Sequence, residues 1–262
     1  MIPTALTIAG SDPSGGAGIQ ADLKTFSSLG VYGMSVVAAL TAQNTQGVRD
    51  VMHVTADFVG LQLDAVLTDI PPAAVKTGML GTAAVVDIVA HKIRRHGVTH
   101  LVVDPVMVSS SGVHLLEHSG EDMLKRALLP LALVVTPNLS EASVLTGVEV
   151  NDLLGMEEAA RRLHRMGARN VLVKGGHLEG DATDVFFDGS RMHRLSSPRA
   201  STKNLHGTGC VLSAAITAWL ASGVPLEEAV QRAKRYVTEA IANSLRLGKG
   251  TGPVNAGRIG LF

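Results

Sequence analysis

A short glycine-rich segment, Gly207-Thr208-Gly209-Cys210, contains the residues best suited to chemistry in this chain. The apolar run 211–216 follows it directly and predicts a helix. A glycine-rich turn that leads into a helix gathers free backbone N–H groups at the positive end of the helix dipole, which makes an anion site. A thiol at the same helix start is expected to be biased toward the thiolate. The segment therefore predicts a cradle for phosphate with a candidate base beside it.

A second glycine-rich loop spans residues 10–18, after a predicted strand over 6–9. It is not a Walker A loop, because no Lys-Ser or Lys-Thr pair follows its glycines. It superficially matches the G-x-G-x-x-A fingerprint of dinucleotide-binding proteins, but that fingerprint needs a carboxylate about 20 residues later, and residues 23–49 contain none. An NAD-dependent dehydrogenase is therefore disfavoured, and the glycines suit close approach of the backbone to a small ligand. Asp12 and Asp22 can each bind a polar group of that ligand; the alternatives are that Asp12 caps the turn and that Asp22 faces solvent.

An amide-rich segment, residues 41–45, follows a second predicted strand over 33–40. Its Gln43 offers one acceptor and two donors, which suits recognition of a heterocycle. The alternative is that this amide is satisfied within its own loop.

Polar residues follow the ends of several later predicted strands. Ligands of open α/β sheets bind outside the carboxyl ends of the strands, so these residues are expected on one rim. Mg²⁺ prefers oxygen ligands and keeps several waters, so Asp104 and Glu141 can hold a hydrated ion. Lys174 can contact phosphate, although Glu141 also suits a first-turn helix acid and Lys174 a surface cation. The residues of this rim are Lys76, Asp104, Thr136, Asn138, Glu141 and Lys174.

Short apolar runs rich in β-branched residues alternate with longer segments of helical periodicity. This alternation predicts a mainly parallel sheet covered by helices on both faces, and an Asp-Gly pair at 188–189 predicts an antiparallel hairpin at its edge. Strands are expected over 6–9, 33–40, 74–76, 101–104, 133–136, 171–174, 184–187 and 192–195. Helices are expected over 17–29, 55–67, 83–95, 121–128, 156–166, 208–221 and 226–245.

The composition narrows the class of protein. With 262 residues, 46% of them hydrophobic, and without a linker or a repeat, the chain is expected to form a single domain over 1–262. Lys plus Arg and Asp plus Glu both number 23 and no basic stripe is visible, which argues against nucleic acid as a partner. A single Cys, no basic signal sequence and no run of 18 uncharged apolar residues predict a reducing, cytoplasmic setting away from membranes. The ten His residues show no metal-ligand spacing, so none is expected to bind a metal.

In combination, these motifs resemble the bacterial hydroxymethylpyrimidine/phosphomethylpyrimidine kinases of thiamine biosynthesis. The motifs occur in family order and span nearly the whole chain. The family is part of the ribokinase-like group, so the resemblance implies a three-layer α/β/α sandwich with a mostly parallel central sheet. The segments that carry it are 5–24 (ALTIAGSDPSGGAGIQADLK), 40–45 (LTAQNT), 75–80 (VKTGML), 103–107 (VDPVM), 136–139 (TPNL), 173–177 (VKGGH) and 206–210 (HGTGC).

The resemblance implies two successive phosphoryl transfers from ATP. The first goes to the hydroxymethyl oxygen of 4-amino-5-hydroxymethyl-2-methylpyrimidine, and the second converts the monophosphate to the diphosphate. Phosphoryl transfer usually has a loose transition state, so a modest base that acts late is sufficient. The resemblance implies this role for Cys210, at a position where most ribokinase-like enzymes have Asp and related pyridoxal kinases also have Cys. The alternative is that Cys210 is a small packed helix residue.

The family pattern also implies roles for other positions, and whether K⁺ assists is left open. The implied pyrimidine pocket, in which the amide of the glutamine pairs with the aminopyrimidine edge, contains Gly10, Asp12, Ala17, Asp22, Gln43 and Met79. The implied ATP site contains Asn138, Lys174 and Thr208. The residues implied to organise Mg²⁺ through water are Asp104 and Glu141. The implied N–H donors to the migrating phosphoryl group are Thr208 and Gly209, and Gly207 is implied to be a catalytic residue of the same turn.

The chain departs from the family pattern in the residues that flank its C-terminal segment 252–255, without a clear consequence, and in one loop. Many members carry a Lys after the 103–107 motif, whereas this chain has Ser109-Ser110-Ser111. The same loop, within 106–114, is a candidate lid that excludes water from the phosphoryl group. The rival functions are a pyridoxal or pyridoxine kinase, which shares the thiol and the phosphate turn, and a pyrimidine sensor without turnover. The resemblance also implies a homodimer.

Overall fold

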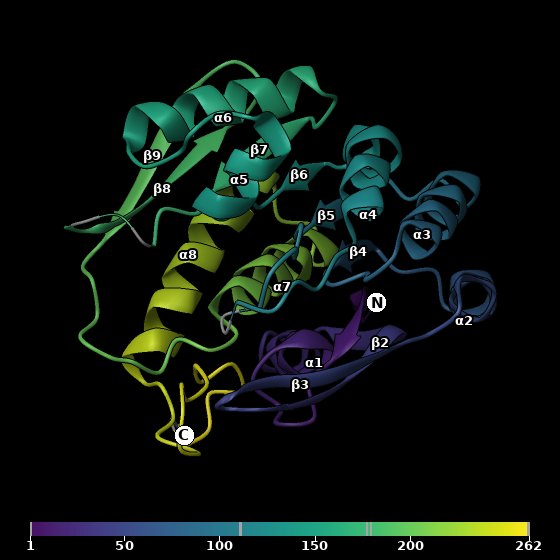
Figure 1. The fold of residues 1–262 in the computed structure, drawn as a ribbon, viewed down its shortest axis with the longest axis horizontal. Coiled ribbons are helices and arrows are strands. Elements are labelled where there is room, and N and C mark those ends of the chain that lie inside the picture. Colours follow the sequence, from purple (N-terminus) through teal and green to yellow (C-terminus); the bar gives the residue numbers. More distant parts are fainter. Residues whose placement is uncertain (1, 110–111, 177, 179, 261–262) are drawn as a thin grey trace.

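The computed structural model describes residues 2–109, 112–176, 178 and 180–260. Its strands are β1 (Thr4–Ser11), β2 (Tyr32–Asn44), β3 (Gly47–His53), β4 (Ala74–Thr77), β5 (Leu101–Val103), β6 (Val134–Val135), β7 (Asn170–Val173), β8 (Ala182–Phe187) and β9 (Met192–Ser197). Its α-helices are α1 (Gly18–Ser28), α2 (Ala56–Asp69), α3 (Ala83–Arg95), α4 (His118–Met123), α5 (Leu139–Thr146), α6 (Leu153–Arg165), α7 (Thr208–Ala221) and α8 (Leu226–Ala242). Figure 1 shows how they are arranged.

The strands form one sheet in the order β3-β2-β1-β4-β5-β6-β7-β8-β9. Neighbours from β2 to β7 run parallel. The pair β8–β9 is antiparallel, as the Asp-Gly hairpin predicted, and the pair β7–β8 is antiparallel as well. A second antiparallel edge, β2–β3, was not predicted. Most of β3 is exposed on both sides, so it lacks the apolar alternation that identifies a strand from sequence.

Alternate side chains of the sheet face two different helical layers. Leu6, Ile8 and Val103 belong to a core shared with residues of α2, α3, α5 and α6. Ala74 and Val102 belong to a second core shared with α7 and α8. Helix α1 joins α7 on that second side. The expected three-layer α/β/α sandwich is therefore confirmed.

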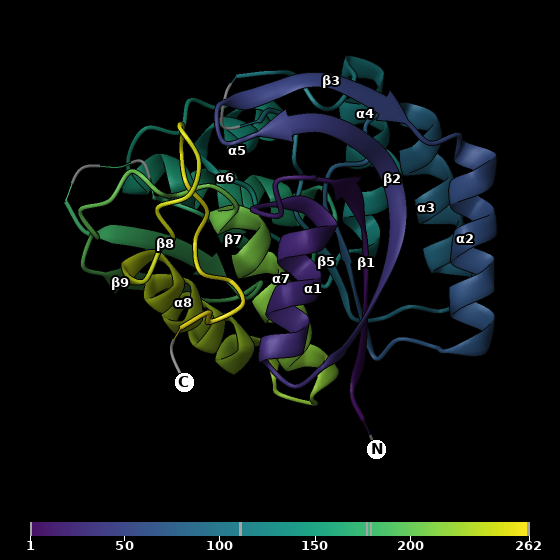
Figure 2. The same ribbon diagram turned by 90° about the horizontal axis from the view of Figure 1, so that it is seen from below.

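The second strand continues beyond its predicted end. The expectation that 41–45 forms a loop is wrong, because β2 runs on to Asn44 and pairs with β3, with Gln43 opposite Val48. Figure 2 shows β2 and β3 as a curved ribbon along the edge of the molecule. The ribbon exists because β3 supplies the backbone partners that the parallel sheet no longer offers at this point. Gln43 is consequently held on a strand.

The helices lie close to their predicted positions, and two of them, over 83–95 and 208–221, match to the residue. The helix expected over 121–128 is divided into α4 and a π-helical turn, Leu124–Leu128. Helix α5 was not among the expected helices, but the alternative for Glu141 as a first-turn helix acid is confirmed, because Glu141 forms with Asn138 the capping box that starts this helix. Among the described residues, no helix is long and apolar enough to cross a membrane.

Candidate active site

The glycine-rich turn at 207–210 has the geometry expected of an anion site. Gly207 precedes α7 with φ +84°, and a Cβ at this position would lie 1.9 Å from the carbonyl oxygen of Gly16. Only glycine can combine this conformation with this approach. Within the described residues, no side chain caps the start of α7 and no acid occupies its first turn. The positive end of the helix dipole is therefore available to an anion.

The start of α7 directly faces polar side chains from two strand ends. A Cβ added to Gly209 would lie 3.2 Å from Lys174 Nζ and 4.0 Å from Asp104 Oδ2. Thr208 behaves differently, because its N–H and hydroxyl both donate to the carbonyl oxygen of Leu205 in this structure. The structure thus brings together the turn and the rim that the sequence predicted separately. The role of the Thr208 N–H stays a prediction.

Asp104 is the buried centre of this cluster. Its Oδ1 accepts from Lys174 at 2.8 Å and from Thr136 at 3.3 Å, while its Oδ2 accepts from Ser213 at 2.9 Å. Burial alone would raise the pKa of Asp104, but Lys174 and Lys76 outweigh it, so the pKa is lowered and the carboxylate is ionised. Ser213 was not predicted from sequence; its only signal is a hydroxyl inside a mostly apolar helix, and Thr217 shares that signal.

Glu141 and Asn138 are fixed by the first turn of α5. Each accepts the backbone N–H of the other at 2.8 Å, and Glu141 Oε2 lies 3.9 Å from Lys174 Nζ. Burial raises the pKa of Glu141 to about 7, partly offset by Lys174 and reinforced by Asp104. The same two carboxylates hold the pKa of Lys174 above its ordinary value, although burial opposes them. The binding of ATP by Asn138 and Lys174 stays a prediction.

The oxygen donors at this rim fit a hydrated Mg²⁺ ion better than a bare one. Lys174 contacts Asp104 and approaches Glu141, so an ammonium group already lies between the two carboxylates. No group of three or more His, Cys, Asp or Glu residues among those described is arranged to hold a metal. An ion that keeps its waters and also binds phosphate oxygens needs only one or two such carboxylates.

The thiol of Cys210 is partly buried at the start of α7. Burial raises its pKa to about 11, and Lys76 opposes this only in part. The expected bias toward the thiolate is therefore wrong for the unliganded chain, because loss of hydration outweighs the nearby ammonium group of Lys76. The group that would accept a proton in catalysis is a protonated thiol in this state.

A fully buried ion pair lies close to Cys210. Lys76 Nζ donates to Asp22 Oδ1 at 2.6 Å, and Thr7 Oγ1 donates to Asp22 Oδ2 at 2.6 Å. Burial tends to lower the pKa of Lys76, but the neighbouring acidic groups outweigh it and hold the lysine in its charged form. The alternative that Asp22 faces solvent is wrong, because this residue has no exposed surface. Direct contact of Asp22 with a pyrimidine stays a prediction, since both its oxygens are engaged.

The residues expected to surround a small ring come together. A Cβ at Gly10 would lie 3.0 Å from Met79 Sδ. Asp12 accepts the backbone N–H groups of Ser14 and Ala17, both at 2.9 Å, so it does cap the first loop. Its Oδ2 also lies 2.8 Å from His206 Nε2. Their roles in binding substrate stay predictions.

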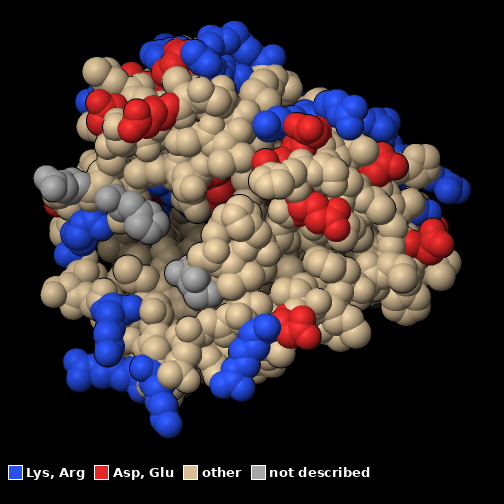
Figure 3. All heavy atoms as spheres, in the orientation of Figure 1, with Lys and Arg blue, Asp and Glu red and all other residues tan. Residues whose placement is uncertain are grey.

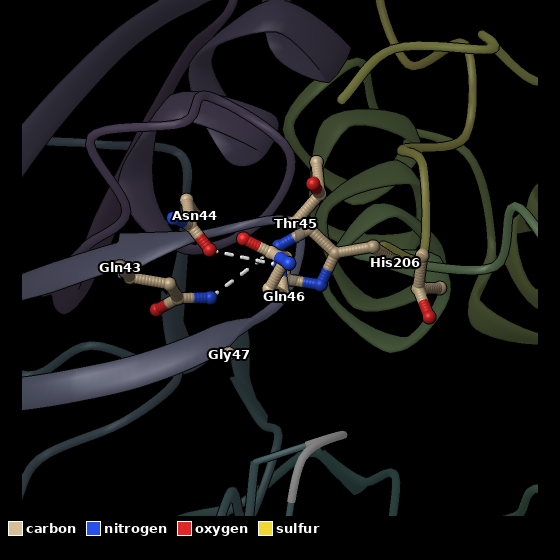
Figure 4. A pocket seen from close by; sticks show the side chains of 7 residues that line it. Gln43, Asn44, Thr45, Gln46, Gly47 and His206 are labelled. Carbon is tan, nitrogen blue, oxygen red and sulfur yellow. Dashed lines mark hydrogen bonds between the residues drawn. The ribbon is translucent and has the colours of Figure 1, made fainter. Parts of the chain in front are cut away.

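A polar cavity of about 240 Å³ lies beside these residues. Gln43 lines it from β2, and His206 lines it from the loop before α7; their Nε2 atoms are 3.4 Å apart (Figure 4). Figure 3 shows a hollow on the molecular surface, with Lys and Arg side chains gathered over the C-terminal segment beside it. Two parts of the candidate lid, Ser110 and Ser111, lie outside the described residues, so the lid stays a prediction.

A solved structure of the pyridoxal kinase of Bacillus subtilis with ADP matches this fold with a TM-score of 0.92 and 40% identity, covering 98% of each chain. The fold and the site thus define a kinase of the ribokinase-like class. A family model described as phosphomethylpyrimidine kinase matches residues 12–255. The chain belongs to this family, which confirms the resemblance found in its motifs.

Two curated relatives give the same result. A hydroxymethylpyrimidine/phosphomethylpyrimidine kinase from Rhizobium meliloti is 54% identical over 259 residues, which cover 97% of both chains. A thiamine biosynthesis bifunctional protein, ThiED, from Geobacter sulfurreducens is 55% identical over 251 residues. The match covers 95% of this chain but only 51% of that protein, so this chain spans about half of the bifunctional relative.

Proposed function

We propose that this chain transfers a phosphoryl group from ATP to the hydroxymethyl oxygen of 4-amino-5-hydroxymethyl-2-methylpyrimidine, and then a second one to the monophosphate, in thiamine biosynthesis. The observation that carries the proposal is the uncapped start of α7, which carries the thiol of Cys210 and at Gly209 faces the largely buried Lys174–Asp104 pair. Family membership supplies the substrate class. We further propose that residues 1–262 act as a single domain in the cytoplasm. We also propose that the chain is a homodimer, which the family resemblance supports.

In the proposed mechanism, the migrating phosphoryl group binds at the first turn of α7. The backbone N–H groups of this turn and the Lys174 ammonium group offset the charge on its oxygens, which is the main source of rate in phosphoryl transfer. The substrate hydroxyl attacks the γ-phosphorus atom of ATP as the bond from this atom to the bridging oxygen breaks, so that ADP leaves. The hydroxyl proton passes late to Cys210 in the thiolate form. The charge of buried Lys76 favours that form. Proximity and charge thus supply most of the catalysis, and proton transfer supplies a smaller part.

We propose that Asp104 and Glu141 hold Mg²⁺ through its water ligands. The ion would neutralise charge on the phosphate oxygens of ATP when it is bound. Both carboxylates are already partnered, Asp104 by Lys174 and Glu141 by the backbone of Asn138. These contacts fit an ion bound mainly by phosphate and water.

The second candidate is a pyridoxal or pyridoxine kinase, which the structural similarity to the Bacillus subtilis pyridoxal kinase favours. Product analysis separates the two functions. The purified chain is incubated with ATP, Mg²⁺ and either alcohol, and the products are identified by mass. The proposal expects the pyrimidine monophosphate and diphosphate, and ATP consumption that depends on the pyrimidine. A kcat/KM that is higher for pyridoxine than for the pyrimidine would reverse the assignment. Pyrimidine binding without turnover would identify the chain as a pyrimidine sensor.

A further inference from the structure

A buried ion pair that the proposed mechanism does not use joins β8 to α8. Asp184 of β8 is only 4% exposed, and its Oδ2 accepts from Lys234 Nζ of α8 at 2.8 Å. Lys234 Nζ also donates to the carbonyl oxygen of Ala182 at 2.9 Å. Helix α8 covers this part of the sheet, so the pair lies between the two layers (Figure 1). The carboxylate is thus held through one oxygen, and its other oxygen can bind a second donor.

That second oxygen binds the backbone that follows Lys174. Asp184 Oδ1 accepts the N–H of Gly175 at 2.9 Å, and the contact is buried. The pairing of β7 with β8 ends at Val173 and Val185, so one more step in this register would bring Lys174 opposite Asp184. A buried N–H needs a partner. Beyond the last strand pair, the side chain of Asp184 supplies that partner.

The backbone of Lys174 is consequently bound on both sides. A Cβ at Gly175 would lie 1.9 Å from the carbonyl oxygen of Thr183, so only glycine allows the chain to pass this close to β8. On the other side, the N–H of Lys174 donates to the carbonyl oxygen of Pro137 at 2.8 Å. The position of the Lys174 backbone is therefore set by one contact before it and one contact after it.

The side chain of Lys174 leads from this fixed backbone to the start of α7. Its Nζ donates to Asp104 at 2.8 Å and would lie 3.2 Å from a Cβ at Gly209. A lysine side chain is a flexible four-carbon stem, so the place of its ammonium group depends on where its backbone is held. Misplacement of a charge by about 1 Å can lower a rate about 10²-fold.

We propose that Asp184 is a positioning residue that holds the Lys174 ammonium group at the phosphoryl site of α7, with Lys234 as its counter-ion. The inference rests on the part of the proposed function in which Lys174 offsets the charge of the migrating phosphoryl group. Asp184 itself does not touch the substrate. It acts through the N–H of Gly175, and its effect on turnover therefore requires the charge of Lys174.

The test compares two double variants that differ only in the acceptor. Asp184→Asn/Lys234→Met removes both charges but keeps a side-chain oxygen for the Gly175 N–H, so it is expected to retain most of the wild-type kcat. Asp184→Leu/Lys234→Met also removes the acceptor and is expected to lower kcat about 10²-fold. The matched control is Glu157→Leu/Arg194→Met, which removes an ion pair between α6 and β9 and is expected to leave kcat unchanged. Urea unfolding shows that each variant is folded.

A third substitution separates positioning from a general loss of structure. Lys174→Gln removes the ammonium group through which Asp184 is proposed to act. In this background, the two double variants are expected to have the same kcat. A drop of about 10²-fold between them in the absence of the ammonium group would overturn the positioning role, and so would equal kcat values when Lys174 is present.

The outcomes also distinguish this inference from the proposed function. The kcat values are measured with whichever alcohol the chain phosphorylates. Turnover of pyridoxine in place of the pyrimidine would overturn the proposed substrate, while the comparison of the variants would still decide the role of Asp184. A chain that phosphorylates neither alcohol would contradict both proposals. If Asp184→Leu/Lys234→Met does not fold, Asp184→Ser/Lys234→Met, whose hydroxyl is too short to reach the Gly175 N–H, is measured in its place.

Discussion

At the scale of single residues, the pKa of Cys210 decides how much thiolate is available for the proposed reaction. Its pKa is raised to about 11 by burial, so the thiol is protonated at neutral pH and only a minor population can accept a proton. Once formed, that thiolate is a strong base beside the charged Lys76. The high pKa thus makes the thiolate rare at neutral pH, but it also makes the thiolate that does form a stronger base.

The raised pKa predicts the chemical reactivity of this thiol. Because only the thiolate reacts with iodoacetamide, the alkylation rate of the unliganded chain is expected to rise about tenfold per pH unit from pH 7 to 9.5. Cys210 is the single Cys of the chain, so mass spectrometry follows it directly. The chain unfolded in urea is the control, and its rate should level off near the ordinary thiol pKa of about 8.5. A plateau near pH 7 in the folded chain would contradict the assignment.

Removal of the thiol tests its part in turnover. Cys210→Ala is expected to lower kcat by about 10²–10⁴-fold, the usual contribution of a general base, with little change in KM for ATP because the N–H groups of α7 remain. Steady-state kinetics with each substrate varied in turn gives both values. A kcat equal to that of the wild type would leave Cys210 as a packing residue.

At the scale of elements, the turn before α7 depends on the backbone of one residue. Gly207 and Gly223 flank α7, both with positive φ, but only Gly207 is pressed against another backbone segment. A side chain at Gly207 would displace either the first loop or the start of the helix. The N–H groups of the turn would then no longer point toward the phosphoryl group.

This contrast gives a matched pair of variants. Gly207→Ala is expected to lower kcat by about 10²–10³-fold, the cost of losing one well-placed N–H donor. Gly223→Ala, which has open space around its Cβ, is expected to cost only about 1–2 kcal/mol of stability through its positive φ and to leave kcat unchanged. Kinetics and urea unfolding of both variants give the comparison. Equal kcat values for the two would show that the close approach has no catalytic consequence.

Some of these elements could be predicted from the sequence and others could not, for physical reasons. Apolar periodicity located most strands and helices because burial imposes it. It could not find β3, whose stability comes from pairing with β2 at an exposed edge. The motifs also located Asp104 and Lys174 on one rim, but Ser213 was missed, and His206 was given no role although it belongs to the 206–210 motif. Their roles arise from contacts between segments 109 and 194 residues apart, which no local pattern records.

At the scale of the whole molecule, the site is held by segments distant in sequence. The C-terminal segment donates from Thr251 to Thr45 in the β2–β3 turn and accepts at Gly252 from His206. The pair Lys76–Asp22 joins β4 to α1 within the protein interior. The proposed ring pocket, the proposed phosphate turn and the thiol are therefore linked through these contacts.

The buried pair makes a prediction about stability. Asp22→Ala leaves the Lys76 ammonium group buried without its partner, which is expected to lower the free energy of unfolding by about 3–5 kcal/mol. The double variant Asp22→Leu/Lys76→Met removes both charges and is expected to recover much of that loss. Urea unfolding of the three chains measures the difference. Wild-type stability in Asp22→Ala would show that the pair does not couple β4 to α1.

The measurement that tests the central claim most directly is a crystal structure with the pyrimidine alcohol and a non-hydrolysable ATP analogue. The account predicts the γ-phosphoryl group at the first turn of α7, with the hydroxymethyl oxygen between it and the sulfur of Cys210. A terminal phosphate bound away from Gly207–Cys210, or an alcohol oxygen pointing away from the sulfur, would contradict it.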